Sequence, residues 1–178
     1  MTTWYTPFNV TQHAEYPDKN IQWQRGANNF DLNIGTHPIQ TVREILYISN
    51  DGHAPLREKT YFLHFTDFRI TDAPDTITGI ELRTTIRRKG RILDETVMLR
   101  YDDMVIGENK INYRLDDFNH VPVNNSSSYG GPIDKWGTTL TKAQIESVSF
   151  GVTLRLQSHL FYPHRETAIV DKVEIRVY

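Results

Sequence analysis

The clearest indication of fold class is the nonapeptide YGGPIDKWG, residues 129–137, with the segment that follows it. A glycine-rich turn and a Trp-Gly corner precede Thr141–Glu146, where Thr141 and Gln144 have the spacing of a helical capping box. Two segments with alternating apolar residues then run to Val177. This order predicts antiparallel β-structure with one short helix at 141–146.

Working outward from this stretch, the chain from residue 41 onward shows further strand patterns. Alternation is cleanest over Gly79–Arg88, where one face is apolar and the other charged, as in a half-buried antiparallel strand. The polar segment 119–131 lacks this pattern and is predicted to be an exposed loop. Long crossings between strands favour Greek-key connections, so we expect an all-β, jelly-roll-like antiparallel β-sandwich domain at 41–178. Other strands are predicted at Thr41–Ser49, Tyr61–Phe68, Thr96–Tyr101 and Met104–Ile106.

Length and composition exclude several classes of function. A chain of 178 residues suits one large domain, and the absence of cysteine excludes disulfides and thiolate zinc sites. With 20 basic and 22 acidic residues the formal net charge is −2, so no nucleic acid or membrane is expected as a partner. No signal peptide and no apolar run of about 20 residues is present. We therefore expect a soluble protein made in a cytoplasm.

Residues 1–40 are predicted to be an irregular arm. They mix Asn, Gln and Thr with aromatic residues, and prolines at 7, 17 and 38 interrupt them. This composition is too apolar for a disordered tail, so the arm should pack on its own domain or on a neighbouring subunit. Because buried Trp and Tyr often dominate interface energy, the candidate subunit contacts are Trp4, Tyr5, Phe8 and Trp23.

No catalytic or metal motif stands out, and no cofactor is expected. His159 and His164 lie in a predicted turn without a clear carboxylate partner, so they are interpreted as loop histidines rather than metal ligands. His64 is interpreted as a hydrogen-bonded, partly buried histidine. The pair Asp102-Asp103 lacks calcium-loop spacing and marks a hairpin turn, and Ser126–Ser128 has no adjacent base.

The segment 129–137 also contains residues for which a structural and a binding role compete. Gly130 and Gly131 fit a tight turn that needs positive φ, and Trp136 fits a buried corner. Tyr129 is a freer aromatic residue that could contact a sugar ring. The other candidate ligand contacts lie in the 158–165 turn; they are His159, Phe161, Tyr162 and His164.

Asp171 is out of place in the last predicted strand. It falls in the same inward phase as Ile169, Val173 and Ile175. Three explanations are open: a buried carboxylate with hydrogen-bond partners, a β-bulge near Lys172 that shifts the register, or a metal ligand.

Four segments together resemble a jelly-roll domain that is common in the virion proteins of tailed bacteriophages. The resemblance spans roughly 76–177 and extends to tail-fibre, minor-tail and head-decoration proteins, which commonly form multimers. The segments are Thr76–Arg83 (TITGIELR) with Arg87-Arg88, Tyr129–Gly137, Phe150–Arg155 (FGVTLR) and Ala168–Ile175 (AIVDKVEI).

This resemblance implies a non-enzymatic structural component of a tailed-phage virion, assembled onto head, neck or tail through subunit contacts. Its expected partners are other virion proteins and further copies of itself, with a trimer as one option. The alternative is a receptor- or carbohydrate-binding module of a phage tail, which would bind a host-surface glycan through Tyr129 and the 158–165 turn.

Overall fold

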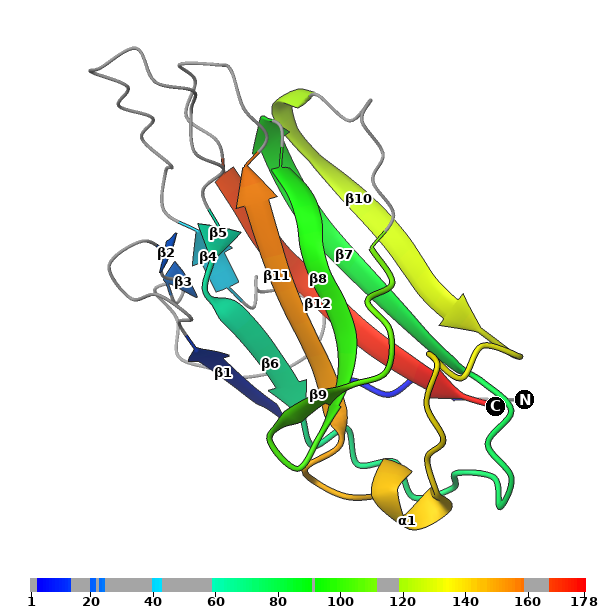
Figure 1. Cartoon of the computed structure of the whole chain (residues 1–178). Coiled ribbons are helices and arrows are strands. Elements are labelled where there is room, and N and C mark those ends of the chain that lie inside the picture. Colours follow the sequence, from blue (N-terminus) through cyan, green and yellow to red (C-terminus); the bar gives the residue numbers. More distant parts are fainter. Residues whose placement is uncertain are drawn as a thin grey trace.

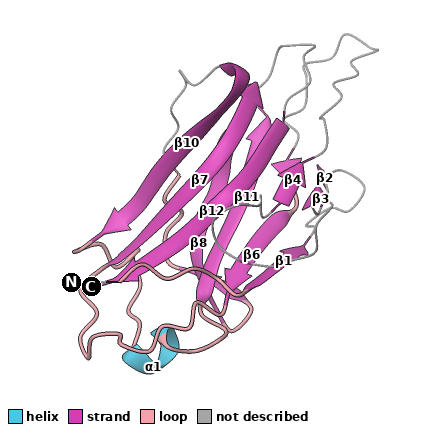
Figure 2. Ribbon diagram, turned by 180° about the vertical axis from the view of Figure 1, so that it is seen from behind, coloured by secondary structure: helices cyan, strands magenta, loops and turns pink. Residues whose placement is uncertain are grey.

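The computed structural model of the chain describes residues 3–13, 20–21, 23–24, 40–42, 59–90, 92–111, 119–158 and 167–178. These residues form two β-sheets that pack face to face, with a short helix at one end (Figures 1 and 2). The predicted all-β antiparallel sandwich is confirmed.

The first sheet has five strands among the described residues, and every pair in it is antiparallel. Of its long strands, β7 follows the predicted alternation. In spatial order the strands are β10 (Asn119–Gly131), β7 (Ile80–Gly90), β12 (Thr167–Val177), β4 (Gln40–Val42) and β3 (Trp23–Gln24). Residues 43–49 of the strand predicted at Thr41–Ser49 lie outside the described residues.

The second sheet has seven strands within the described part of the chain. One path runs through β1 (Asn9–His13), β6 (Phe62–Thr66), β11 (Gly151–Ser158), β5 (Lys59–Thr60) and β2 (Asn20–Ile21). β11 also pairs with β8 (Ile92–Tyr101), which forms the predicted hairpin with β9 (Met104–Ile106). At its turn Asp102 and Asp103 have φ of 51° and 64°, a left-handed conformation that Asp tolerates better than most residues.

The core lies between the two sheets, where the apolar side of each alternating strand is turned inward. On β7 the predicted inward set, which includes Ile80, Leu82 and Ile86, is almost completely inaccessible to solvent. The largest fully buried side chains are Trp136, Phe65, Phe150, Leu63, Ile80, Leu82, Ile86, Leu99, Ile145, Leu154 and Leu156.

The prediction of an exposed loop at 119–131 is wrong, because this segment is strand β10. It pairs with β7, with Ser127 opposite Thr84 and Tyr129 opposite Leu82. The alternation that marks a strand is weak here because Ser and Asn occupy six of the 13 positions. Among the β10 side chains that the structure describes, Tyr129 is the only buried one. Backbone pairing along one edge holds such a strand without an apolar stripe.

Residues 3–13 of the predicted arm pack on their own domain, which was one of the two alternatives. Tyr5 exchanges two backbone hydrogen bonds of 2.8 Å with Ile175 of β12, and Asn9–His13 forms β1 alongside β6. The segment therefore contacts both sheets and ties them together along one side of the sandwich (Figure 1).

Asp171 lies at a β-bulge, one of the three alternatives left open. The register of β12 against β7 shifts between Val170 and Lys172, so Asp171 has no partner position in the ladder. Its carboxylate is 3.4 Å from the Arg87 guanidinium and is partly exposed. The bulge turns Val170 inward and leaves Ile169 only partly buried, which corrects the predicted inward position of Ile169.

The helix α1 (Lys142–Ile145) has the capping box predicted from its sequence. The Thr141 hydroxyl accepts a hydrogen bond from the Gln144 backbone N–H, and the Gln144 side chain accepts one from the Thr141 N–H. These bonds satisfy N–H groups that a helix terminus otherwise leaves unpaired. Ile145 anchors the short helix in the core.

Replacing Thr141 with alanine removes the side-chain half of this cap and should lower the free energy of unfolding by about 1 kcal/mol. Urea unfolding of the wild type and of Thr141→Ala measures the difference. The matched control is Thr139→Ala, which removes an exposed threonine two residues before the cap. An equal effect of the two substitutions would contradict a stabilising role for the cap.

Candidate functional sites

The aromatic residues predicted to contact other subunits are engaged within the chain where the structure describes them. The Trp4 ring lies between two guanidinium groups on the outer face of the first sheet, 4.2 Å from Arg83 and 4.0 Å from Arg176. Phe8 is partly exposed under the Arg69 guanidinium, at 3.5 Å. Of Trp23 only the backbone, in β3, is described.

The predicted ligand contacts do not form a described site. Tyr129 is buried, with 5% of its surface exposed, so it is not the freer aromatic residue that was predicted from sequence. Its ring occupies an inward position of β10 because it stands opposite Leu82. The other four candidates, His159, Phe161, Tyr162 and His164, lie outside the described residues.

Tyr129 belongs instead to a buried polar cluster between the sheets. Its hydroxyl donates to Asp94 Oδ2 at 2.7 Å, and Arg88 Nη2 donates to Asp94 Oδ1 at 2.6 Å. Arg88 Nη1 also donates to the Ile92 carbonyl at 3.1 Å. Burial, and then the neighbouring Asp94 carboxylate, raise the pKa of Tyr129 above its usual value. The phenol therefore stays protonated and serves as a hydrogen-bond donor.

A register shift accounts for the buried position of Asp94. β8 and β11 pair Thr96 with Arg155 and then Asp94 with Leu156, which leaves Glu95 as the extra residue. Asp94 consequently faces the core, as Val97 does. Glu95 lies at the surface, where it forms an ion pair with Lys59 at 2.8 Å. Periodicity alone would have placed Glu95 inward, so sequence reasoning missed this cluster.

A second polar cluster lies on the outer face of the second sheet, around His64. The imidazole Nδ1 is 3.0 Å from the Thr153 hydroxyl, and the ring stacks on Phe62 and His13. The Arg155 guanidinium lies over the Phe62 ring, 4.4 Å from its centroid. The interpretation of His64 as a hydrogen-bonded, partly buried histidine is confirmed.

The stability of the fold should decrease as pH falls from about 6.5 to 4 because of His64. Burial, and then the nearby Arg100 and His13 charges, lower its pKa from 6.5 to about 4, although Asp103 acts in the opposite direction. The unfolded chain therefore binds this proton more readily than the folded one, so stability is fully present above pH 6.5 and falls below it.

Urea unfolding between pH 7 and 4.5 measures this contribution of His64. His64→Gln should lose less stability over the interval than the wild type, because glutamine keeps a polar partner for Thr153 and does not titrate. His13→Gln removes one of the neighbouring charges that lower the pKa of His64 but leaves the imidazole in place, so it should reduce the loss by less than His64→Gln does. Parallel pH profiles for the wild type and His64→Gln would refute the assignment.

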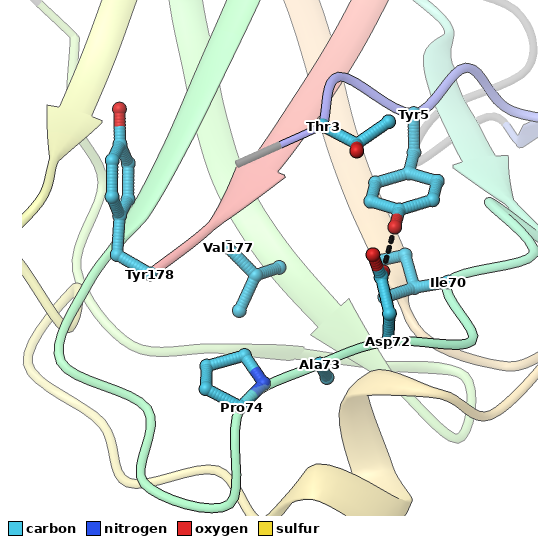
Figure 3. A pocket seen from close by; sticks show the side chains of 8 residues that line it. All are labelled: Thr3, Tyr5, Ile70, Asp72, Ala73, Pro74, Val177 and Tyr178. Carbon is cyan, nitrogen blue, oxygen red and sulfur yellow. Dashed lines mark hydrogen bonds between the residues drawn. The ribbon is translucent and has the colours of Figure 1, made fainter. Parts of the chain in front are cut away.

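A small pocket of about 190 Å³ opens beside the described ends of the chain (Figure 3). Residues from three segments, 3–5, 70–74 and 177–178, line it. Its walls are mainly apolar, and the Tyr5 hydroxyl donates to the Asp72 carboxylate at one side. Segments so far apart in sequence carry no common motif, so sequence reasoning could not find this pocket.

The outer edge of β10 is the longest free strand edge among the described residues. β7 pairs with one side of β10, and no described strand pairs with the other (Figures 1 and 2). By comparison, β1 and β9 contain five and three residues. Sequence reasoning selected the segment 119–131 as exposed, but it did not recognise the strand.

The described part of the chain contains neither a cluster of metal ligands nor a membrane-spanning helix. Across those residues no three His, Asp or Glu side chains gather closely enough to hold a metal ion. No helix in the described ranges has the length and apolar character needed to cross a membrane.

Comparison with protein-family models and with curated proteins finds no match to this chain. Its function therefore has to be inferred from its fold and surfaces. Of the features above, the two polar clusters are occupied by contacts within the chain. The pocket and the β10 edge are the features that offer room or hydrogen bonds to another molecule.

Proposed function

We propose that this protein is a non-enzymatic structural component of a tailed-phage virion, which holds its neighbours through the edge and faces of a β-sandwich. The observation that carries the proposal is the free edge of β10. It offers a row of backbone N–H and C=O groups on a strand that contains no charged residue. The virion setting is supported by the resemblance of residues 76–177 to phage jelly-roll domains.

The arm takes a different part in this proposal from the one expected from sequence. Tyr5 and β1 pair with β12 and β6, so residues 3–13 stabilise the sandwich itself. Removing them would expose the edges of two strands and lower stability, whether or not the arm contacts a neighbour. A test of assembly is therefore better aimed at β10.

The proposal is tested by locating the protein in lysates that contain phage particles. Density-gradient centrifugation followed by mass spectrometry should recover the chain in the particle band, in a constant ratio to the other particle proteins. Recovery only in the particle-free fractions would contradict a structural role in the virion.

Glycan binding is a second candidate function, favoured by the pocket of Figure 3. Tyr5 and Tyr178 contribute aromatic rings to it, and Asp72 contributes a carboxylate. Aromatic walls with a few polar groups are typical of small-molecule sites, and a sugar ring can use both kinds of contact. Saturation-transfer NMR with a panel of monosaccharides tests the idea, with Tyr178→Ala as the variant expected to lose the signal. No transfer to any sugar in the panel would exclude this function for the pocket.

A further inference from the structure

The regular part of the β10 edge is long and straight enough to pair with another strand. From Val123 to Gly131 nine consecutive residues keep an unbroken register with β7. At about 3.4 Å per residue this gives an edge of roughly 30 Å. Every second residue turns its backbone N–H and C=O away from β7, so the edge presents regularly spaced donors and acceptors.

This edge lacks the features that usually protect a strand from pairing. Proteins shorten exposed edges or place charges, prolines and bulges on them. β10 does contain a proline, Pro122, and a register irregularity, but both lie before Val123, where the regular part begins. No Lys, Arg, Asp or Glu occurs anywhere in the strand.

The charges nearest to this edge are already paired within the chain. On the outer face of the adjacent strand β7, Arg83 lies 2.7 Å from Glu174, and Arg87 lies 3.4 Å from Asp171. On β10, Ser128 stands opposite Arg83 and Asn124 opposite Arg87, and between them Ser126 Oγ lies 3.1 Å from Thr85 Oγ1. A strand that approaches β10 therefore meets a strand without charges, beside arginines whose charges are paired with carboxylates of β12.

We propose that the β10 edge pairs with the β10 edge of a second copy of this chain, antiparallel and about a two-fold axis at Ser126. This inference rests on the proposed function and names the partner of its contact surface. With Ser126 opposite Ser126, Ser127 stands opposite Asn125, Ser128 opposite Asn124, and Tyr129 opposite Val123. The pairing joins the two five-stranded sheets into one continuous sheet.

The chemistry of the strand favours a second copy over an unrelated strand. A two-fold interface brings each residue against the same surface of the partner, so the strand must be compatible with itself. In this register every position pairs uncharged residues with uncharged residues, and serine faces asparagine or serine at the centre. A charged strand would repel its own copy and would need a partner of opposite sign.

The absence of cysteine makes a site-specific cross-linking test direct. Ser126→Cys introduces the only thiol of the chain, at a position that the pairing places on the two-fold axis. Treatment with a short bis-maleimide reagent should convert most of this variant to a covalent dimer. Thr11→Cys, at an exposed position of the other edge strand β1, is the matched control and should stay monomeric. Equal cross-linking of the two variants, or none, would overturn the proposal.

A charge variant tests the same contact without a reagent. Ser126→Lys places two ammonium groups against each other at the axis, so the dimer should dissociate, while Ser126→Thr should keep it. Both variants should retain the thermal unfolding temperature of the isolated fold, because Ser126 is exposed within one copy. A dimer that persists in Ser126→Lys would refute β10 as the interface. A wild type that pairs only with another particle protein would refute a second copy of the chain as the partner.

The failure of this inference can be distinguished from the failure of the proposed function. A protein found in particles but monomeric and not cross-linked at Ser126 retains its structural role and loses the β10 dimer. A protein that dimerises through β10 but never appears in particles retains the dimer and loses the virion role.

Discussion

Replacing Trp136 with alanine is expected to lower the free energy of unfolding by about 3–5 kcal/mol, the range for removing a large buried aromatic side chain. The indole is fully buried, and its Nε1 donates a 2.8 Å hydrogen bond to the Ile80 carbonyl. Gly130 packs so closely that a Cβ there would lie 2.4 Å from Nε1. The substitution therefore leaves a cavity and removes the donor for a buried carbonyl.

The backbone at Trp136 adds to this expectation. Its φ of 57° is unfavourable for a bulky residue, and packing of the ring offsets that cost. Alanine would keep the strained backbone and lose the packing.

Two further variants make the test of Trp136 specific, and urea unfolding measures all three. Trp136→Phe keeps much of the ring but not the Nε1–H donor, so its effect should be intermediate. Trp4→Ala removes the tryptophan that packs on the sheet surface between Arg83 and Arg176, and it should cost less than Trp136→Ala. Similar losses for Trp4→Ala and Trp136→Ala would contradict the role of Trp136 as the buried corner.

Breaking the buried pair between Arg88 and Asp94 is expected to cost a similar amount, about 3–5 kcal/mol for Asp94→Ala. Both side chains are only 8% exposed, and the Asp94 carboxylate accepts from Arg88 and from the Tyr129 hydroxyl. Removing the carboxylate leaves a guanidinium between the sheets without a counter-charge. The cost comes from that orphaned charge rather than from the attraction itself.

A double-mutant cycle separates the two contributions. Arg88→Met combined with Asp94→Leu removes both charges, so it should be much more stable than Asp94→Ala and should show a large coupling energy. Tyr129→Phe, which removes one neutral donor to Asp94, should cost less than Asp94→Ala. Additive effects of the two charge substitutions in urea unfolding would show that the pair does not act as a unit.

The elements with strong local patterns could be predicted from sequence. The alternation of Gly79–Arg88, the capping box at Thr141 and the burial of Trp136 depend on neighbours in the chain, and each is found in the structure. Such features follow from periodicity and from hydrogen bonds within a few residues.

The features that depend on register or on a distant partner could not be predicted with the same certainty. Asp94 is inward because a bulge at Glu95 changes the phase of β8, and Asp171 lies at a bulge in β12. β10 was missed because Ser and Asn carry no apolar stripe, and pairing with β7 supplies its order. The burial of Tyr129 could not be predicted for the same reason, and because its hydrogen-bond partner Asp94 lies on the other sheet.

The same limits apply to the candidate sites. The pocket combines three segments that are far apart in sequence, and the β10 edge is visible only once the order of strands is known. The resemblance to phage virion domains implies subunit contacts, and the composition of the arm placed the candidate contacts on its aromatic residues. Trp4 and Tyr5 contact the chain's own sheet, and β10 is the surface that we propose for assembly.

Sedimentation equilibrium of the purified chain across a range of concentrations tests assembly through β10 most directly. The account predicts a wild-type mass that approaches twice the 20.7 kDa of one chain, and a mass of 20.7 kDa for Ser126→Lys, which should still unfold at the temperature of the isolated fold. A wild type that stays at 20.7 kDa at every concentration would contradict it.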